Sequence, residues 1–239
     1  MMFQIKNLSF GYTKPLLESP INAEFQPSQL IVLYGNNGCG KTTFIKTIAR
    51  LIKPLSGEIY FNNQDVFKMN NEHFAKTFAF LFTNRPFLMN HTVMDVLALG
   101  RLPYLEWNAQ LKTKDIDIIL YYANFLKIEE WLTLHANQLS DGQLQKVLLA
   151  KTLIQQTPVV ILDEPLSYLD YGTKKFILSK LSELIKMENK IIIMSSHDVH
   201  ICSNYANAVL LMHNKKWLYT TADKVSEQKL FSDFLMTEV

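Results

Sequence analysis

Cysteine is scarce in this sequence, with only Cys39 and Cys202 among 239 residues. Two thiols far apart in the chain do not make a disulfide framework, and such a count is typical of a protein kept in a reducing compartment. Apolar runs such as 159–162 and 191–194 have only the length of a strand. A bilayer-spanning helix needs about 20 apolar residues. We therefore expect any membrane-spanning part to belong to another chain.

A strong charge of either sign is also absent, because the formal net charge is +2 and the Lys and Arg residues are scattered. A nucleic-acid partner is not expected, since such proteins show a basic domain or stripe. No Gly/Ser-rich linker divides the chain, and 48% of its residues are hydrophobic. One folded unit with a substantial core is expected. The first ten residues lack the apolar core of a signal peptide, so we expect a cytoplasmic protein.

Short apolar strands alternate with amphipathic helices along the chain, which is typical of an α/β fold with a parallel sheet covered on both faces. The predicted strands cover residues 2–10, 30–34, 58–61, 78–82, 159–162 and 191–194. The predicted helices cover 42–52, 115–126 and 173–187, and a further helix is expected from Ser140. The predicted apolar faces are Ile116, Ile119, Leu120 and Ala123 in the second of these helices and Ile177, Leu178, Leu181, Leu184 and Ile185 in the third.

A glycine-rich segment, GNNGCGKT at 35–42, follows the strand predicted at 30–34 and matches G-x-x-x-x-G-K-[ST]. Its glycines let backbone N–H groups converge on phosphate oxygens, and the positive end of the next helix faces the same anion. Lys41 is predicted to reach the β- and γ-phosphates of ATP, and Thr42 to ligate Mg²⁺. The nucleotide-binding residues predicted here are Gly35, Asn36, Asn37, Gly38, Cys39, Gly40, Lys41, Thr42 and Thr43.

Two acids, Asp163 and Glu164, end the apolar strand predicted at 159–162. Acids at a strand end are often no more than a solvated terminus. Together with the segment at 35–42, however, they predict that Asp163 enters the Mg²⁺ shell and that Glu164 polarises the attacking water beside the γ-phosphate.

Four further segments resemble motifs of the ABC ATPases. LSDGQ at 139–143 is similar to the LSGGQ signature, and SYLD at 167–170 to the D-loop. SSHD at 195–198 resembles the switch-histidine segment, and FGY at 10–12 the aromatic loop. The resemblance extends from Phe3 to about Met212. It implies one P-loop NTPase domain of the ABC type over 1–239, with a small antiparallel β subdomain and a helical signature subdomain inserted at about 85–150.

The resemblance also implies residue roles, because two such domains pair head to tail with ATP between one phosphate loop and the partner's signature. His197 would hold the γ-phosphate and the water in register with Glu164. Asp170 would couple the two sites across the interface. Tyr12 would stack on adenine, the alternative being that it packs against a strand end. The signature residues facing the partner's nucleotide would be Ser140, Asp141, Gly142 and Gln143.

Two positions depart from the family pattern. Thr83, with Asn84 after it, stands where the family has a glutamine that touches Mg²⁺. A threonine hydroxyl is shorter than a glutamine amide, so we expect it to reach the metal only through water or a shifted loop. Asp141 replaces a signature glycine, and its carboxylate is expected to point away from phosphate. Cys39 is interpreted as a small filler residue or, alternatively, a reactive thiol.

The region 92–104 is similar to the same region of importer ATPases for iron–siderophores, haem and cobalamin, although its apolar residues also suit plain helix packing. This similarity implies a homodimer at the inner face of the membrane, two integral-membrane permease subunits on other chains, and a substrate-binding protein that acts indirectly. An importer for another small substrate is an alternative, as is a soluble single-cassette ATPase of the assembly or remodelling type. The cargo and the role of 223–239 are not predicted.

Overall fold

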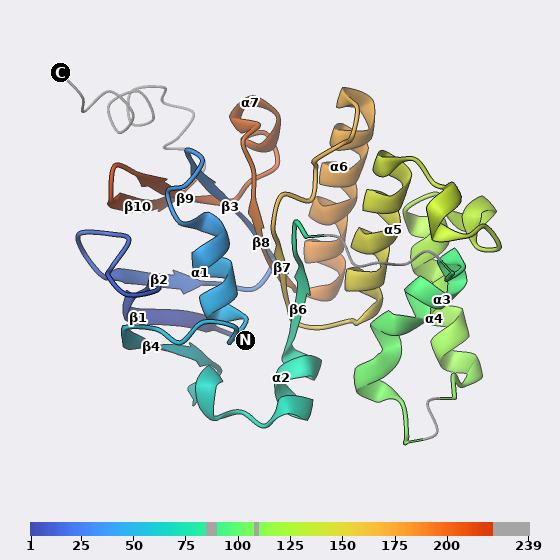
Figure 1. The fold of residues 1–239 in the computed structure, drawn as a ribbon, viewed down its shortest axis with the longest axis horizontal. Helices are drawn as coiled ribbons and strands as arrows, with labels where there is room; N and C mark the ends of the chain where they lie inside the picture. The colour runs from blue at the N-terminus through green and yellow to red at the C-terminus, as the bar shows by residue number, and fades with distance from the viewer. Residues whose placement is uncertain (85–89, 108–109, 222–239) are drawn as a thin grey trace.

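Two β-sheets and seven α-helices make up the part of the chain that this computed structural model describes, which is residues 1–84, 90–107 and 110–221 (Figure 1). The larger sheet has the strand order β10-β9-β3-β8-β7-β6. Its strands from β9 to β6 run parallel, and β10 is antiparallel to β9. These strands are β3 (Gln29–Gly35), β6 (Phe78–Leu81), β7 (Val159–Leu162), β8 (Ile191–Ser195), β9 (Ala208–His213) and β10 (Lys216–Thr221).

The smaller sheet is antiparallel and has the order β2-β1-β4-β5. Its strand β2 alternates buried and exposed residues, because one face packs on the core and the other faces solvent. Strands β7 and β8 are buried throughout, as expected for parallel strands covered on both faces. The smaller sheet consists of β1 (Phe3–Ser9), β2 (Ile21–Phe25), β4 (Ser56–Phe61) and β5 (Gln64–Asp65).

The helices cover both faces of the larger sheet, so the core has two parts. One part joins one sheet face to α1 and the smaller sheet, and the other joins the opposite face to α3–α6. The helices are α1 (Lys41–Ile48), α2 (Asn71–Thr77), α3 (Val93–Ala98), α4 (Thr113–Phe125), α5 (Asp141–Ile154), α6 (Tyr171–Glu188) and α7 (Val199–Cys202). Short 3₁₀ helices are η1 (Val66–Lys68), η2 (Leu99–Tyr104), η3 (Glu129–Trp131) and η4 (Ala136–Gln138).

The fold class predicted from the sequence is confirmed, with the helical segment α3–α5 lying in the chain between the adjacent strands β6 and β7. Several element bounds were wrong by a few residues. Helix α1 ends at Ile48 rather than at residue 52, because Arg50 adopts a left-handed φ of 62°. Helix α6 begins at Tyr171, since the side chain of Asp170 caps it by accepting from the N–H of Thr173.

The apolar face predicted for the helix at 115–126 was partly wrong. Ile119 and Ala123 are buried, as are all five residues of the face predicted for α6. Ile116 and Leu120, however, are 37% and 45% exposed. Helix α4 is rotated because Asp115 turns inward to an ion pair and the buried Tyr122 donates to Glu188 Oε1 at 2.8 Å.

Candidate active site

The phosphate loop (residues 35–42) joins the end of β3 to the start of α1. Gly40 is the residue before α1 and has φ = 109°, which residues with a side chain rarely adopt. At Gly35 a Cβ atom would lie 2.2 Å from the carbonyl oxygen of Met212. Glycine is therefore required at both positions, and the loop delivers the free N–H groups of the α1 N-terminus to its concave side.

Lys41 lies at this N-terminus with its ammonium group held by the loop itself. Its Nζ donates to the carbonyl oxygens of Gly35 at 2.7 Å and Asn36 at 3.2 Å. The side chain is largely buried, and its positive charge is directed into the loop. When phosphate oxygens replace these carbonyl acceptors, the lysine would have negatively charged acceptors in place of neutral ones.

A hollow of about 330 Å³ lies over the phosphate loop. The side chain of Tyr12 lines it and is 69% exposed, so this residue does not simply pack against a strand end. Asn36 and Cys39 do not line the hollow, and Cys39 is partly buried. The hollow therefore joins the aromatic loop to the phosphate loop and to one of the two acids. Its lining residues are Tyr12, Leu16, Asn37, Gly38, Gly40, Lys41, Thr42, Thr43 and Glu164.

Asp163 follows β7 and is only 1% exposed, yet three hydroxyl groups donate to its carboxylate. Thr42 and Thr83 both donate to Oδ2, at 2.9 and 3.0 Å, and Ser195 donates to Oδ1 at 2.8 Å. The expectation that Thr83 reaches Mg²⁺ only through water or a shifted loop stays a prediction. Its hydroxyl does lie within hydrogen-bond distance of the same carboxylate oxygen as the hydroxyl of Thr42.

The donor set around Asp163 fits Mg²⁺, which prefers oxygen ligands and takes one or two from the protein beside substrate phosphates. Within the described residues, no group of three or more His, Cys, Asp or Glu side chains is arranged to hold a metal ion. A cation here would rely on the hydroxyls of Thr42 and Thr83, the carboxylate of Asp163 and a nucleotide.

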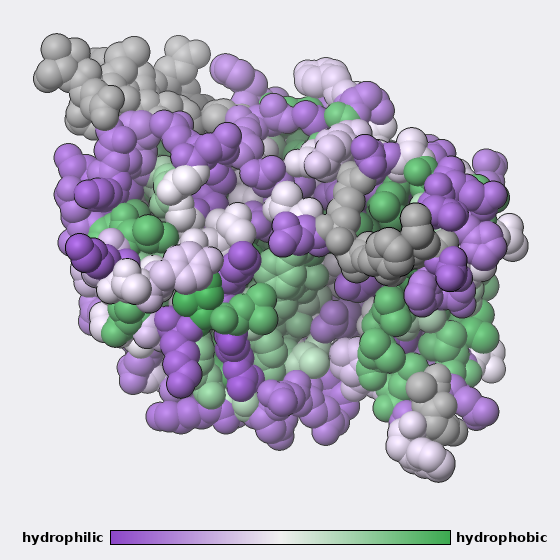
Figure 2. All heavy atoms as spheres, in the orientation of Figure 1, coloured by the Kyte–Doolittle hydropathy of each residue, from purple (hydrophilic) through white to green (hydrophobic). Residues whose placement is uncertain are grey.

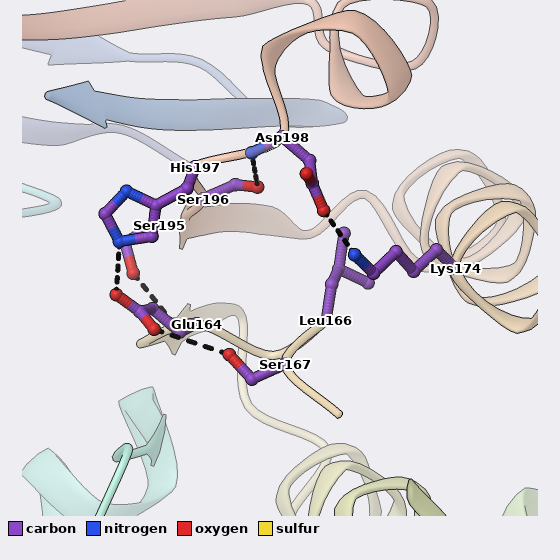
Figure 3. Close-up of a pocket in the computed structure, with 8 residues that line it drawn as sticks. All are labelled: Glu164, Leu166, Ser167, Lys174, Ser195, Ser196, His197 and Asp198. Atoms are coloured by element: carbon purple, nitrogen blue, oxygen red, sulfur yellow. Dashed lines mark hydrogen bonds and ion pairs between the residues drawn. The ribbon is translucent and has the colours of Figure 1, made fainter. Parts of the chain in front are cut away.

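Glu164, which lines the hollow, contacts His197 (Figure 3). The Nε2 atom of His197 lies 2.7 Å from Glu164 Oε1, and the Ser167 hydroxyl donates to Oε2 at 3.3 Å. Both Glu164 and His197 also line an adjoining pocket of about 80 Å³, which is large enough for water. Glu164 therefore lies between a space that suits water and the space above the phosphate loop.

The signature segment (residues 139–143) begins α5. Ser140 is the N-cap, and its hydroxyl accepts from the N–H of Gln143 at 3.3 Å while Gln143 Oε1 accepts from the N–H of Ser140 at 2.8 Å. Ser140 and Asp141 are exposed. None of the signature residues lines either hollow. The structure thus separates the signature from the phosphate loop of the same chain.

Asp170 is also outside both hollows, at the N-terminus of α6. Hydrogen bonds from the hydroxyl and N–H of Thr173 lower the pKa of its carboxyl group. The carbonyl oxygen of Tyr168, two residues earlier, would lie 2.9 Å from a Cβ atom at Gly142. Gly142 is therefore the point at which the D-loop packs closely against the signature segment.

Sequence reasoning assigned no role to several residues that touch the acids. Ser195 bonds to both acids and Ser167 to Glu164, and Gln145 Nε2 donates to the carbonyl oxygen of Glu164 at 3.4 Å. The parallel register of the structure places Ser195 there, because Leu162 pairs with Met194 and the residues that follow them are neighbours. No motif of the sequence indicates this contact. The segments 85–89 and 223–239, which the sequence analysis also considered, lie outside the described residues.

Comparisons with known proteins agree with this geometry. The family model described as ABC transporter matches residues 19–167. The petrobactin import ATP-binding protein FpuD of Bacillus anthracis is 30% identical over 98% of this chain and 86% of its own length. The probable siderophore transport system ATP-binding protein YusV of Bacillus subtilis is 31% identical over 88% and 77%.

A solved metal-chelate type ABC transporter in an inward-facing conformation superposes with a TM-score of 0.82 at 22% identity, covering 98% of this chain and 88% of that one. At this identity the superposition supports the fold alone. No helix among the described residues is long and apolar enough to cross a membrane. Family model, relatives and fold agree, and the chain belongs to the ABC transporter family as an ATP-binding, ATP-hydrolysing subunit.

Proposed function

We propose that this chain powers an importer of metal chelates, such as iron–siderophores, haem or cobalamin-like compounds, through ATP hydrolysis at the site described above. The observation that carries the hydrolytic part is the contact between Glu164 and His197 at the edge of the phosphate-loop hollow. The names of FpuD and YusV, which refer to petrobactin import and siderophore transport, support the cargo class.

In this proposal the phosphate loop binds the nucleotide and Tyr12 stacks on its base. Lys41 and the N–H groups at the start of α1 bind the β- and γ-phosphates. Thr42, Asp163 and Thr83 hold Mg²⁺, which would neutralise charge on the phosphates when bound. Their hydroxyls and carboxylate already lie together, so binding needs little rearrangement of the protein.

Glu164 acts as the general base in the proposed reaction. A base must lie within hydrogen-bond reach of the water from which it takes a proton, and Glu164 lines the pocket of about 80 Å³ beside the phosphate-loop hollow. His197 binds Oε1 and so fixes the carboxylate, and it can also bind the γ-phosphate. The proton of the attacking water passes to Glu164 as the water oxygen bonds to the γ-phosphorus, while the bond from that phosphorus to the oxygen of the β-phosphate breaks and ADP leaves.

Two copies of the chain form the working unit, paired head to tail. Ser140 is exposed, and the signature segment lies apart from the phosphate loop of its own chain. In the dimer, the Ser140 of one copy therefore reaches the nucleotide bound by the other copy. The start of α5 offers N–H groups and a positive dipole end to the γ-phosphate. Asp141 points away from that phosphate, and Asp170 couples the two sites.

The dimer binds two integral-membrane permease subunits at the inner face of the membrane, and a substrate-binding protein delivers cargo to them. The whole chain is one ABC ATPase domain, and its inserted helical segment (about 85–150) contacts the permease. Figure 2 shows apolar residues gathered on the surface of this segment. The exposed apolar side chains there include Leu99, Leu102, Ile116 and Leu120.

The test is ATP hydrolysis by the purified chain beside its Glu164→Gln variant, with gel filtration in ATP. We expect hydrolysis by the native chain and a loss of at least about 100-fold in the variant, which elutes as an ATP-bound dimer. Glu183→Gln is the matched control, because Glu183 is a half-exposed carboxylate on α6 paired with Lys180. Equal activity of both variants would refute the role of Glu164. Failure of the chain to co-purify with membrane subunits would refute the importer.

A further inference from the structure

Ser195 is the last residue of β8 and lies beside the two acids that follow β7. The parallel pairing of Leu162 with Met194 puts Ser195 next to Asp163. Its side chain is fully buried, although it is among the residues around the pocket of about 80 Å³ beside Glu164. Its hydroxyl is bonded to both acids, so its influence on the reaction is exerted through them.

The hydroxyl of Ser195 joins the two acids to each other. It donates to Asp163 Oδ1 at 2.8 Å and accepts from the backbone N–H of Glu164 at 2.8 Å. A serine hydroxyl has one proton to donate, and here that proton is directed at Asp163. Figure 3 shows Ser195 beside Glu164 and His197.

The contact with Ser195 matters because the backbone of Glu164 has an unusual conformation. Its φ of 51° is left-handed, a conformation that is strained for a non-glycine residue and persists only where the surroundings enforce it. The N–H of Glu164 is the group that Ser195 holds. On the other side, Oδ2 of Asp163 is already bound by Thr42 and Thr83, so Ser195 fixes the rotation of the carboxylate through Oδ1.

We propose that Ser195 is a positioning residue that sets the metal-binding carboxylate of Asp163 and the carboxylate of Glu164 in one fixed arrangement. The inference rests on the proposed roles of these two acids. Removal of the hydroxyl leaves Oδ1 buried without this donor and the Glu164 N–H without this acceptor. A displacement of about 1 Å can lower a rate by about 100-fold, so loss of Ser195 reduces turnover more than it reduces nucleotide binding.

The experiment compares Ser195→Ala, Ser195→Thr and Thr152→Val. Thr152 is the control for loss of a buried hydroxyl, because it is fully buried in α5 and donates to the carbonyl of Leu148 at 2.9 Å. The readouts are kcat, KM for ATP, the Mg²⁺ concentration for half-maximal activity, and Tm. Ser195→Ala is expected to lower kcat about 10- to 100-fold and raise the Mg²⁺ requirement several-fold, with KM within about threefold.

Ser195→Thr retains the hydroxyl and is expected to keep kcat within about threefold of the native value. A folded Ser195→Ala chain whose kcat and Mg²⁺ requirement match those of Thr152→Val would overturn the inference. If Ser195→Ala does not fold, Ser195→Cys replaces it under the same criteria, since a thiol fills the site but donates weakly. An active Glu164→Gln chain would instead reject the proposed function, and native-like Ser195→Ala beside inactive Glu164→Gln rejects this inference alone.

Discussion

At the residue scale, the site depends on which groups donate hydrogen bonds to one buried carboxylate. Asp163 is 1% exposed, and burial of a carboxylate is costly unless hydrogen bonds replace its water. Hydroxyl groups from the phosphate loop, from the segment after β6 and from β8 supply those bonds. Asp163 therefore connects three parts of the chain that are far apart in sequence, and a change at any of them is transmitted to its carboxylate.

Thr83→Val tests the part of this arrangement that departs from the family. Valine has nearly the shape of threonine but no hydroxyl, so the bond to Asp163 Oδ2 is lost while Thr42 still holds that oxygen. A hydrogen bond from a neutral hydroxyl to a charged carboxylate contributes about 1.5–3 kcal/mol of stabilisation, which the variant loses. We expect the Mg²⁺ concentration for half-maximal ATP hydrolysis to rise about 3- to 10-fold.

The control is Thr77→Val, which removes a buried hydroxyl bonded to the carbonyl of His73, away from the acids. Thr42→Val is the second comparison, because it removes the other hydroxyl that donates to Asp163 Oδ2, from a residue of the phosphate loop itself. If Thr83→Val requires no more Mg²⁺ than Thr77→Val, Thr83 does not serve the metal position, and its bond to Asp163 has a structural role only.

At the scale of elements, a buried ion pair ties the helical segment α3–α5 together. Arg101 in η2 donates to Asp115 Oδ1 of α4 at 2.8 Å and to the carbonyl of Ile154, the last residue of α5, at 3.0 Å. The two side chains are 5% and 10% exposed. Burial raises the pKa of Asp115, but the hydrogen bonds from Arg101 and the Lys112 N–H outweigh it, so the pKa lies below its ordinary value.

Arg101→Met should therefore destabilise the fold by about 3–5 kcal/mol at pH 7, because it leaves the Asp115 charge buried without its partner. The measurement is urea unfolding followed by circular dichroism. The double variant Arg101→Met/Asp115→Asn should regain much of the loss, since no charge is then left unpaired. A single variant within about 1 kcal/mol of native would show that the pair contributes little.

The same pair predicts how stability depends on pH. The folded pKa of Asp115 is lower than its unfolded value of about 3.9, so the pair stabilises the fold above that pH. The stabilisation is lost as the pH falls through the folded pKa. Between about pH 5 and 2 the native chain should lose more unfolding free energy than the double variant does.

The same region shows where sequence reasoning was insufficient. The apolar periodicity predicts a helix at α4 but indicates a buried face that includes Ile116 and Leu120, and both residues are partly exposed in the structure. The helix is oriented instead by polar groups, Asp115 and Tyr122, whose partners lie 14 and 66 residues away along the chain. Apolar periodicity carries no information about such partners.

The residues predicted for the candidate site lie close together because they follow strands of a parallel sheet. Carboxyl ends of neighbouring parallel strands meet at one edge, so the phosphate loop after β3, the acids after β7 and His197 after β8 had to converge. Contacts between side chains of those strands, such as Ser195 with Asp163, depend on register. No local sequence pattern specifies that register.

At the scale of the whole molecule, the signature segment and the phosphate-loop hollow of one chain lie apart. The phosphate-loop hollow is lined on the side of α1 and the acids, and no residue of the signature segment reaches it. Ser140 and its capping box with Gln143 hold the start of α5 in an exposed, preformed arrangement. A helix N-terminus with free N–H groups is an anion-binding element. Its proposed anion is the nucleotide of a second copy.

Together with the proposed head-to-tail pairing, this separation predicts that ATP hydrolysis depends on chain concentration. If each site needs the signature of a partner, the rate at saturating ATP should rise with the square of the concentration while monomers predominate, and linearly once dimers do. A site completed within one chain gives a linear dependence throughout. The measurement is a dilution series over about three decades, with an inert carrier protein to prevent adsorption and with dimerisation of Glu164→Gln followed by sedimentation. A constant rate per chain below the concentration at which that variant dissociates would mean that Ser140 serves no partner, and the head-to-tail arrangement would be wrong even if the chain hydrolyses ATP.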